Sequence, residues 1–147
     1  MKITDALRGE HGVLYAQFDR LEEELPHVAT AAEVREQAAL LASALISHAR
    51  IEDELLFNRM LGAGADPGLL GAMAEDHAQI TDRLARAQGT NDVESARMEL
   101  LEAVATARDH FAKEERLAFP LAESMLDTKA LEALGAAWAG RRDVFVD

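Results

Sequence analysis

The sequence predicts an all-α protein: an up-down-up-down antiparallel four-helix bundle followed by a short fifth helix. Ala, Leu, Glu and Arg are abundant, only 5% of the residues are aromatic, and runs of β-branched residues are absent. Four segments carry apolar residues in alternating steps of three and four, which is the spacing of helices packed in a bundle. Helix-start and helix-stop residues separate these segments.

The first helix is expected to begin after Thr4 and to end before Pro26. The core-facing series along it is Leu7, His11, Leu14, Phe18, Leu21 and Leu25. His11 is therefore the only polar residue on the face that should turn toward the core.

The second helix is expected to begin with a capping box over residues 30–33 and to end in the glycine-rich stretch 62–64. Its core-facing series is Val34, Ala38, Leu41, Leu45, His48, Glu52 and Leu55. The two polar members, His48 and Glu52, are four residues apart, so both side chains lie on one face of the helix.

Asp66 followed by Pro67 predicts the start of a third helix, and Gly89 predicts its end. The core-facing series of this helix is Leu70, Met73, His77, Ile80, Leu84 and Ala87. Its single strongly polar member is again a histidine.

The fourth helix is expected to start at Asn91, with Glu94 three residues later. Its core-facing series is Ala96, Leu100, Ala103, Ala107, His110, Glu114, Leu117 and Leu121. Here too a histidine precedes a glutamate by four residues. Pro120 should kink or end the helix, because proline removes a backbone donor.

A short fifth helix at about 128–141 is expected to pack over one end of the bundle, with Trp138 as a packing residue. The bundle should span about residues 4–125, and the chain 1–147 is expected to form one domain. Residues 143–147 are compatible with a loose tail or with a docked segment.

The composition limits the kinds of partner and ligand. The chain has no cysteine, so disulfides and thiolate ligands are excluded and any metal must be held by His and carboxylate groups. A formal charge of −12 argues against nucleic acid and anionic membranes as partners. With no bilayer-spanning apolar run and no secretory signal, the protein is expected to be cytoplasmic.

The polar residues of the four core-facing series should meet at one depth of the bundle. In an antiparallel hairpin, residues at one depth are equidistant from the turn. The midpoint in sequence between His11 and the His48/Glu52 pair is about residue 30, which lies in the first expected turn. The midpoint between that pair and His77 is about residue 64, which lies in the second expected turn. The third turn fits less well, because its centre falls roughly four residues too late, an offset of about 6 Å along the helix axis.

Six polar side chains in an apolar core need compensation. Left unpaired, each costs ~1–3 kcal/mol, so six together cost as much as the ~5–15 kcal/mol stability of a typical domain. A hydrogen-bonded network that sets helix register is one solution. We favour metal coordination, because every helix contributes and only at this depth. Two ions, each held by two histidines and sharing Glu52 and Glu114, would use all six groups; Fe, Mn, Zn or Cu suits these ligands.

The set His11, His48-x-x-x-Glu52, His77 and His110-x-x-x-Glu114 resembles the hemerythrin-like (HHE cation-binding) domain family over about residues 5–125. The resemblance implies a non-haem centre of two Fe ions with an oxo or hydroxo bridge, with these six residues as ligands. It also implies that O2, hydrogen peroxide or NO reacts at an open iron position. Mn or Zn is not excluded by the ligand types.

One position departs from the oxygen-carrying hemerythrins, which have a further histidine one turn before the third-helix ligand. Here that position is Met73, which we interpret as a core residue. The missing imidazole leaves a further metal position open or filled by water, and it argues against simple reversible O2 carriage.

Several other polar residues lie near the predicted ligands. Tyr15 could ligate, donate a hydrogen bond or supply an electron, and we interpret it as a flanking residue with its hydroxyl in water. Glu115 could replace Glu114 only if the helix rotated by about 100°. Asp76 and Asp109 could orient an imidazole of a neighbouring helix or face solvent.

The sequence thus leads to the hypothesis of a di-iron protein that reacts with O2, hydrogen peroxide or NO, with catalase-like peroxide turnover as its enzymatic form. No catalytic residue is assigned beyond the metal ligands. The alternative is a non-enzymatic iron or oxygen sensor or storage protein. We expect a monomer or a weak homo-oligomer, with neither nucleic acid nor a membrane as partner.

Overall fold

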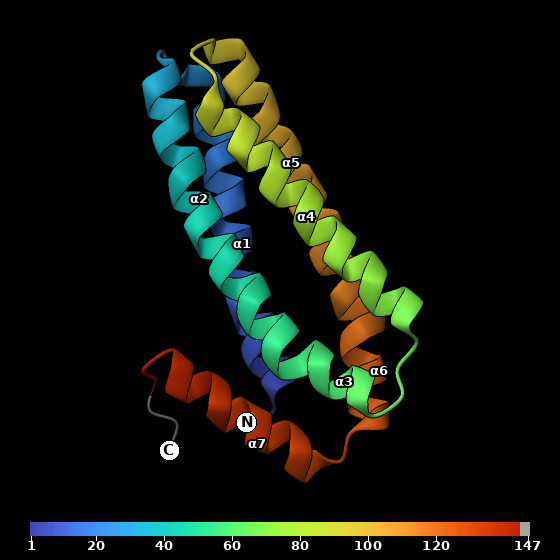
Figure 1. Ribbon diagram of the computed structural model, residues 1–147. Helices are drawn as coiled ribbons and strands as arrows, with labels where there is room; N and C mark the ends of the chain where they lie inside the picture. The colour runs from blue at the N-terminus through green and yellow to red at the C-terminus, as the bar shows by residue number, and fades with distance from the viewer. Residues whose placement is uncertain (145–147) are drawn as a thin grey trace.

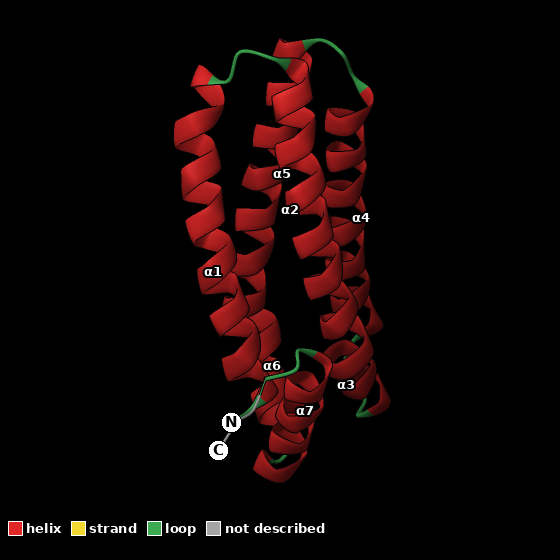
Figure 2. Cartoon of the chain, turned by 90° about the vertical axis from the view of Figure 1, so that its left-hand side faces the viewer, coloured by secondary structure: helices red, strands yellow, loops and turns green. Residues whose placement is uncertain are grey.

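The predicted bundle is present in the computed structural model, which describes residues 1–144. Four long helices run antiparallel to one another (Figures 1 and 2). They are α1 (Ile3–Glu24), α2 (Ala31–Ile51), α4 (Pro67–Gly89) and α5 (Val93–Lys113). A short 3-10 turn, η1 (Leu25–His27), follows α1. Of the predicted tail, residues 145–147 lie outside the described part of the chain.

The helix ends follow most of the predicted start and stop signals. Thr30 and Glu33 form the reciprocal capping box, and Asp66 caps α4 by accepting a hydrogen bond from the backbone N–H of Gly68 at 2.9 Å. The predicted start of α5 at Asn91 is wrong by one residue. Asp92 is the N-cap, because its carboxylate accepts from both the backbone N–H and the hydroxyl of Ser95.

Helices α2 and α5 each continue into a π-helical segment, and each segment starts at one of the predicted glutamates, Glu52 or Glu114. Segment η2 (Glu52–Phe57) separates α2 from α3 (Asn58–Gly62), and η3 (Glu114–Ala118) separates α5 from α6 (Phe119–Met125). A π turn takes one residue more than an α turn. The core-facing side of each helix therefore moves on by about one residue after the glutamate.

Because of this shift, the predicted core-facing series of the second and fourth helices are wrong at their last positions. Leu117 is 48% exposed rather than buried, and Leu55 and Leu121 are only half-buried. The residues that follow them are the buried ones, namely Leu56, Ala118 and Ala122. Pro120 is the second residue of α6, which directly continues η3, so the interruption begins before the proline, at Glu114, and not at it.

The core consists of two apolar clusters with the polar residues between them. One cluster, which includes Phe18, Leu84 and Leu100, fills the end of the bundle that holds the α1–α2 and α4–α5 turns. The other, which includes Leu7 and Phe119, fills the opposite end. The layer between them is thus enclosed by apolar side chains on both sides.

The predicted fifth helix is α7 (Thr128–Arg141), which crosses the lower end of the bundle and packs against α1 (Figure 2). The packing is close at Gly135, where a Cβ atom would lie 2.2 Å from the carbonyl oxygen of Met1. Among residues 1–144, no helix is long and apolar enough to cross a membrane.

Replacing Gly135 with alanine is expected to lower the free energy of unfolding by about 1–3 kcal/mol, because the new methyl group has to displace the N-terminal segment. Urea unfolding measures this change. Gly140→Ala in the same helix is the matched control: of residues 1–144, none has an atom within 4 Å of its Cβ position, so this variant should be neutral or up to about 1 kcal/mol more stable. Equal stability of the two variants would contradict the described contact.

Candidate metal centre

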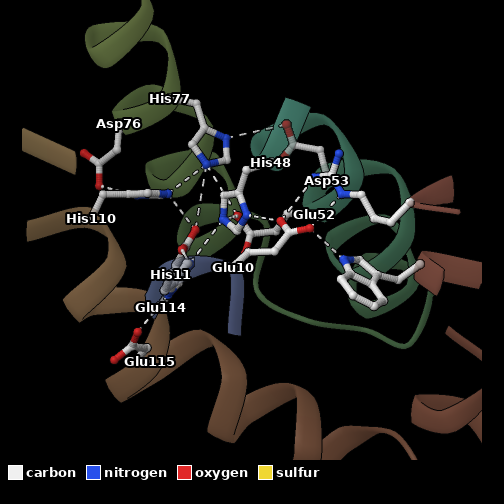
Figure 3. Close-up of polar contacts among 12 residues, drawn as sticks. Glu10, His11, His48, Glu52, Asp53, Asp76, His77, His110, Glu114 and Glu115 are labelled. Atoms are coloured by element: carbon white, nitrogen blue, oxygen red, sulfur yellow. Dashed lines mark hydrogen bonds and ion pairs between the residues drawn. The ribbon is translucent and has the colours of Figure 1, made fainter. Parts of the chain in front are cut away.

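The six predicted side chains converge between the two apolar clusters (Figure 3). Every long helix or its π extension contributes to this layer: His11 from α1, His48 and Glu52 from α2 and η2, His77 from α4, and His110 and Glu114 from α5 and η3. Five of the six residues are at most 2% exposed, and only the His77 side chain, at 13%, is noticeably accessible.

The nitrogen and oxygen atoms of these residues form two adjoining groups that could each hold a metal ion, and within each group they lie within 4.8 Å of one another. The His11/His48 group contains these two histidines with Glu52 and Glu114. The His77/His110 group contains the other two histidines with the same glutamates. Both carboxylates are thus shared, which is the arrangement expected for two ions bridged by Glu52 and Glu114.

The predicted axial offset between α4 and α5 does not separate their histidines. Side chains on a helix lean toward the N-terminus of that helix. Because α4 and α5 are antiparallel, His77 and His110 lean toward each other, and their Nε2 atoms are 2.7 Å apart. The predicted offset was estimated from residue positions along the backbone alone. The tilt of the two side chains toward each other compensates for it.

Each imidazole of the His11/His48 group donates a hydrogen bond from Nδ1, on the side away from the layer, to a carboxylate of another element. His48 donates from Nδ1 to Oε2 of Glu10 at 2.6 Å, and His11 donates from Nδ1 to Oε1 of Glu115 at 2.8 Å. These bonds place the proton on Nδ1 and leave the lone pair of Nε2 facing the layer. A metal-binding histidine needs this tautomer, and such a carboxylate also makes the imidazole more basic.

The His77/His110 group repeats the pattern more loosely. His110 donates from Nδ1 to Oδ2 of Asp76 at 3.2 Å, whereas Nδ1 of His77 is 3.6 Å from Oδ2 of Asp53, too far for a hydrogen bond. The prediction that Asp76 could orient an imidazole of a neighbouring helix is confirmed. Asp109 is exposed, in agreement with the solvent-facing alternative.

Two of these four outer carboxylates, Glu10 and Asp53, were not recognised as partners of the histidines from the sequence. A signal for them exists, because each outer carboxylate is the sequence neighbour of a core-facing polar residue. The neighbours are Glu10-His11, Glu52-Asp53, Asp76-His77 and Glu114-Glu115. The pairing partners are not visible in the sequence, since every contact joins different elements.

Tyr15 and Met73 occupy the surroundings that we expected for them. The Tyr15 ring is half-buried and packs edge-on against His11, with 6.3 Å between ring centroids. Burial raises the pKa of Tyr15, and the charge of Glu115 raises it further. Met73 is 2% exposed and belongs to the apolar cluster that includes Leu7 and Phe119, which agrees with its interpretation as a core residue.

The two shared glutamates carry the strongest indication that a cation belongs here. Both oxygens of Glu52 and both oxygens of Glu114 are buried without a hydrogen-bond partner among residues 1–144. They face imidazole lone pairs instead: Oε1 of Glu114 is 2.6 Å from Nε2 of His110, a repulsive contact unless a proton or a metal ion is shared. A self-satisfied polar network would not leave four carboxylate oxygens unpaired.

The pKa values show how strongly the two glutamates and the imidazoles of the layer affect one another. Burial raises the pKa of Glu52, and the negative charge of Glu114 raises it further. Burial alone would lower the pKa of His77, but Asp53, Glu114 and Glu52 together raise it to about 11. Burial alone would raise the pKa of Glu114, but its contacts with His11, His110 and His77 lower it well below its usual value. Divalent cations held by the same atoms would replace the protons that these groups share. The residues present fit a pair of metal ions.

A small pocket reaches the imidazoles from the groove between α2 and α4. Its polar lining includes His48, His77, His110 and Thr81, and the remaining lining residues are apolar, namely Leu45, Ala49, Ile80 and Phe111. The free volume of about 20 Å³ is enough for one water-sized molecule. Any ligand that reaches the layer by this route must therefore be small.

Fold and site together define a helical bundle in which facing helices project into the core side chains that could hold metal ions. The family model of the hemerythrin HHE cation binding domain matches residues 2–122, so the chain belongs to this family. The matched range ends before α7. Comparison with curated proteins and with solved structures finds no significant match.

Substituting Glu52 with methionine is expected to raise the free energy of unfolding of the metal-free protein by about 1–3 kcal/mol. The change removes two buried oxygens that have no partner and keeps a similar side-chain volume. Urea unfolding in the presence of a chelator measures this. Glu36→Met, at an exposed position of α2, should change stability by less than about 0.5 kcal/mol. Destabilisation by Glu52→Met would show that the carboxylate is stably paired without metal.

Proposed function

We propose that this protein holds two iron ions between its four long helices and reacts with O2, hydrogen peroxide or NO. The observation that carries the proposal is the pair of fully buried glutamates, which both His groups share and whose oxygens have no other partner. His11 and His48 would hold one ion, and His77 and His110 the other. Glu52 and Glu114 would contact both ions.

Iron in such a site supplies the redox chemistry by which small oxidants are bound and reduced. The chain itself contributes three things. The imidazoles present Nε2 lone pairs in fixed directions, because Glu10, Glu115 and Asp76 bind the opposite nitrogens. The two apolar clusters keep bulk water away from the layer. The pocket beside His77 restricts access to molecules of one or two heavy atoms.

The proposed redox chemistry favours iron over Zn, whereas ligand type does not choose between iron, Mn and Zn. Imidazole and carboxylate groups suit all three metals, but zinc has no redox chemistry. Turnover of peroxide would make the protein an enzyme of the catalase-like type. Stoichiometric iron binding without turnover would instead favour the sensor or storage role. Both roles require the same metal site.

Purified metal-free protein titrated anaerobically with ferrous salt is expected to retain two ions per chain, one for each group of ligands. At a free concentration about 100-fold above Kd, each bound ion should stabilise the fold by about 2.7 kcal/mol, so two ions should add about 5 kcal/mol, or roughly 10–20 °C in Tm for a domain of this size. His77→Ala should lose one of the two ions. No retention of iron by the wild-type protein, with an unchanged Tm, would contradict the proposal.

Enlarging Ala49, which lines the pocket beside His48 and His77, should separate ligand access from metal binding. Ala49→Leu is expected to keep the iron content and to slow the reaction of the ferrous protein with peroxide by about 10-fold or more, since the side chain fills the approach. Stopped-flow absorbance measures the rate. Ala39→Leu, at an exposed position of α2, is the control and should react at the wild-type rate. An unchanged rate for Ala49→Leu would exclude this route.

A further inference from the structure

The C-terminal helix α7 reaches into the metal centre through a single carboxylate, Glu10. Trp138 donates from Nε1 to Oε1 of Glu10 at 2.8 Å. Arg142, the C-cap residue of α7, donates to the same carboxylate from Nε at 2.7 Å and from Nη2 at 3.2 Å. The other oxygen of Glu10 accepts the 2.6 Å bond from His48. Trp138 and Arg142, which lie outside the matched family range, are thus hydrogen-bonded to the carboxylate that accepts the bond from His48.

Arg142 also connects this contact to the second helix. Its Nη1 atom donates to the hydroxyl of Ser47, the residue before His48, at 2.5 Å. The guanidinium therefore lies between α1, which carries Glu10, and α2, which carries His48. The side chains of Glu10 and Arg142 are 16% and 25% exposed, so solvent competes weakly for these bonds. Burial would raise the pKa of Glu10, but its bonds to His48, Arg142 and Trp138 lower it to about 2.

The equivalent carboxylate of the His77/His110 group is held far less firmly. Asp76 receives one bond of this kind, from Nζ of Lys113 at 2.9 Å, and this lysine is 43% exposed and lies on the same helix as His110. Asp76 is also farther from its histidine than Glu10 is from His48, at 3.2 Å against 2.6 Å. The second histidine of this group, His77, has no hydrogen bond at Nδ1.

We propose that Trp138 and Arg142 are positioning residues that make the His11/His48 group the tighter of the two metal sites. The inference rests on the proposed function. A histidine whose orientation and tautomer are fixed before the metal arrives loses less conformational freedom on binding, and its carboxylate partner makes it a better ligand. The first ion is held by His11 and His48. The His77/His110 group, both of whose histidines line the pocket whereas only His48 of the other group does, binds the ion that exchanges and meets the small ligand.

The test is a stepwise titration of the metal-free protein with Co²⁺ at 25 °C, followed by calorimetry and by the visible absorption of the bound ion. Trp138→Phe removes the indole N–H and keeps an aromatic ring, and Arg142→Ala removes the guanidinium. Both variants should weaken the tighter step by about 10- to 100-fold and leave the weaker step unchanged. The absorption of the first equivalent should change as well, which a loss of global stability alone would not produce.

Two controls make the assignment specific. Arg141→Ala affects the neighbouring arginine of α7, which pairs with Glu54 and not with Glu10, and should leave both steps unchanged. Lys113→Ala should weaken only the second step, through Asp76. In a His77→Ala background, which removes a ligand of the other group, Trp138→Phe should still weaken the remaining step.

Outcomes for the inference and for the proposed function are distinct. If the wild-type protein binds two ions and Trp138→Phe and Arg142→Ala leave the tighter step unchanged, the inference is wrong and the metal site stands. An equal loss with Arg141→Ala, or a loss in the weaker step instead, would overturn it in the same way. If the wild-type protein binds no divalent ion at all, the proposed function itself fails.

Discussion

Two buried glutamates impose the energetic constraint on which the rest of this structure depends. Glu52 and Glu114 lie between two apolar clusters, and none of their four carboxylate oxygens has a hydrogen-bond partner. An unpaired buried charge is among the most costly features a fold can contain. Three of the four imidazoles do not relieve this cost, because outer carboxylates bind the Nδ1 atoms of His11, His48 and His110 and direct their Nε2 lone pairs toward the same oxygens. The surroundings of the two glutamates are suited to cations and to little else.

The two halves of the bundle solve this problem in the same way. In each hairpin the first helix carries an acid followed by a histidine, and the second carries a histidine, a glutamate four residues later and then another acid. A π segment begins at each of the two glutamates, which are Glu52 and Glu114. Such segments are often found at functional sites, where they change the direction of side chains within a helix. The halves differ in their outer support, since only Glu10 receives donors from α7.

The convergence of the six polar side chains was predictable from the sequence, because a histidine or glutamate on an otherwise apolar helix face has few alternative explanations. The π segments were not, because the stretch around Leu55 and Leu56 offers apolar residues for either continuation of the helix. The outer carboxylates were also hidden: Glu10 and Trp138 are far apart in the sequence, and their contact depends on how α7 crosses α1. Contacts between elements depend on helix rotation, about which the periodicity of a single helix says little.

The most direct measurement of the central claim is a crystal structure of the iron-loaded protein with anomalous data collected at the iron edge. We expect two anomalous peaks inside the bundle, one in each of the two histidine groups, with Glu52 and Glu114 between them. The imidazole Nε2 atoms, and not the Nδ1 atoms, should face the peaks. Iron found only on the acidic surface, or no peak between the two apolar clusters, would contradict it.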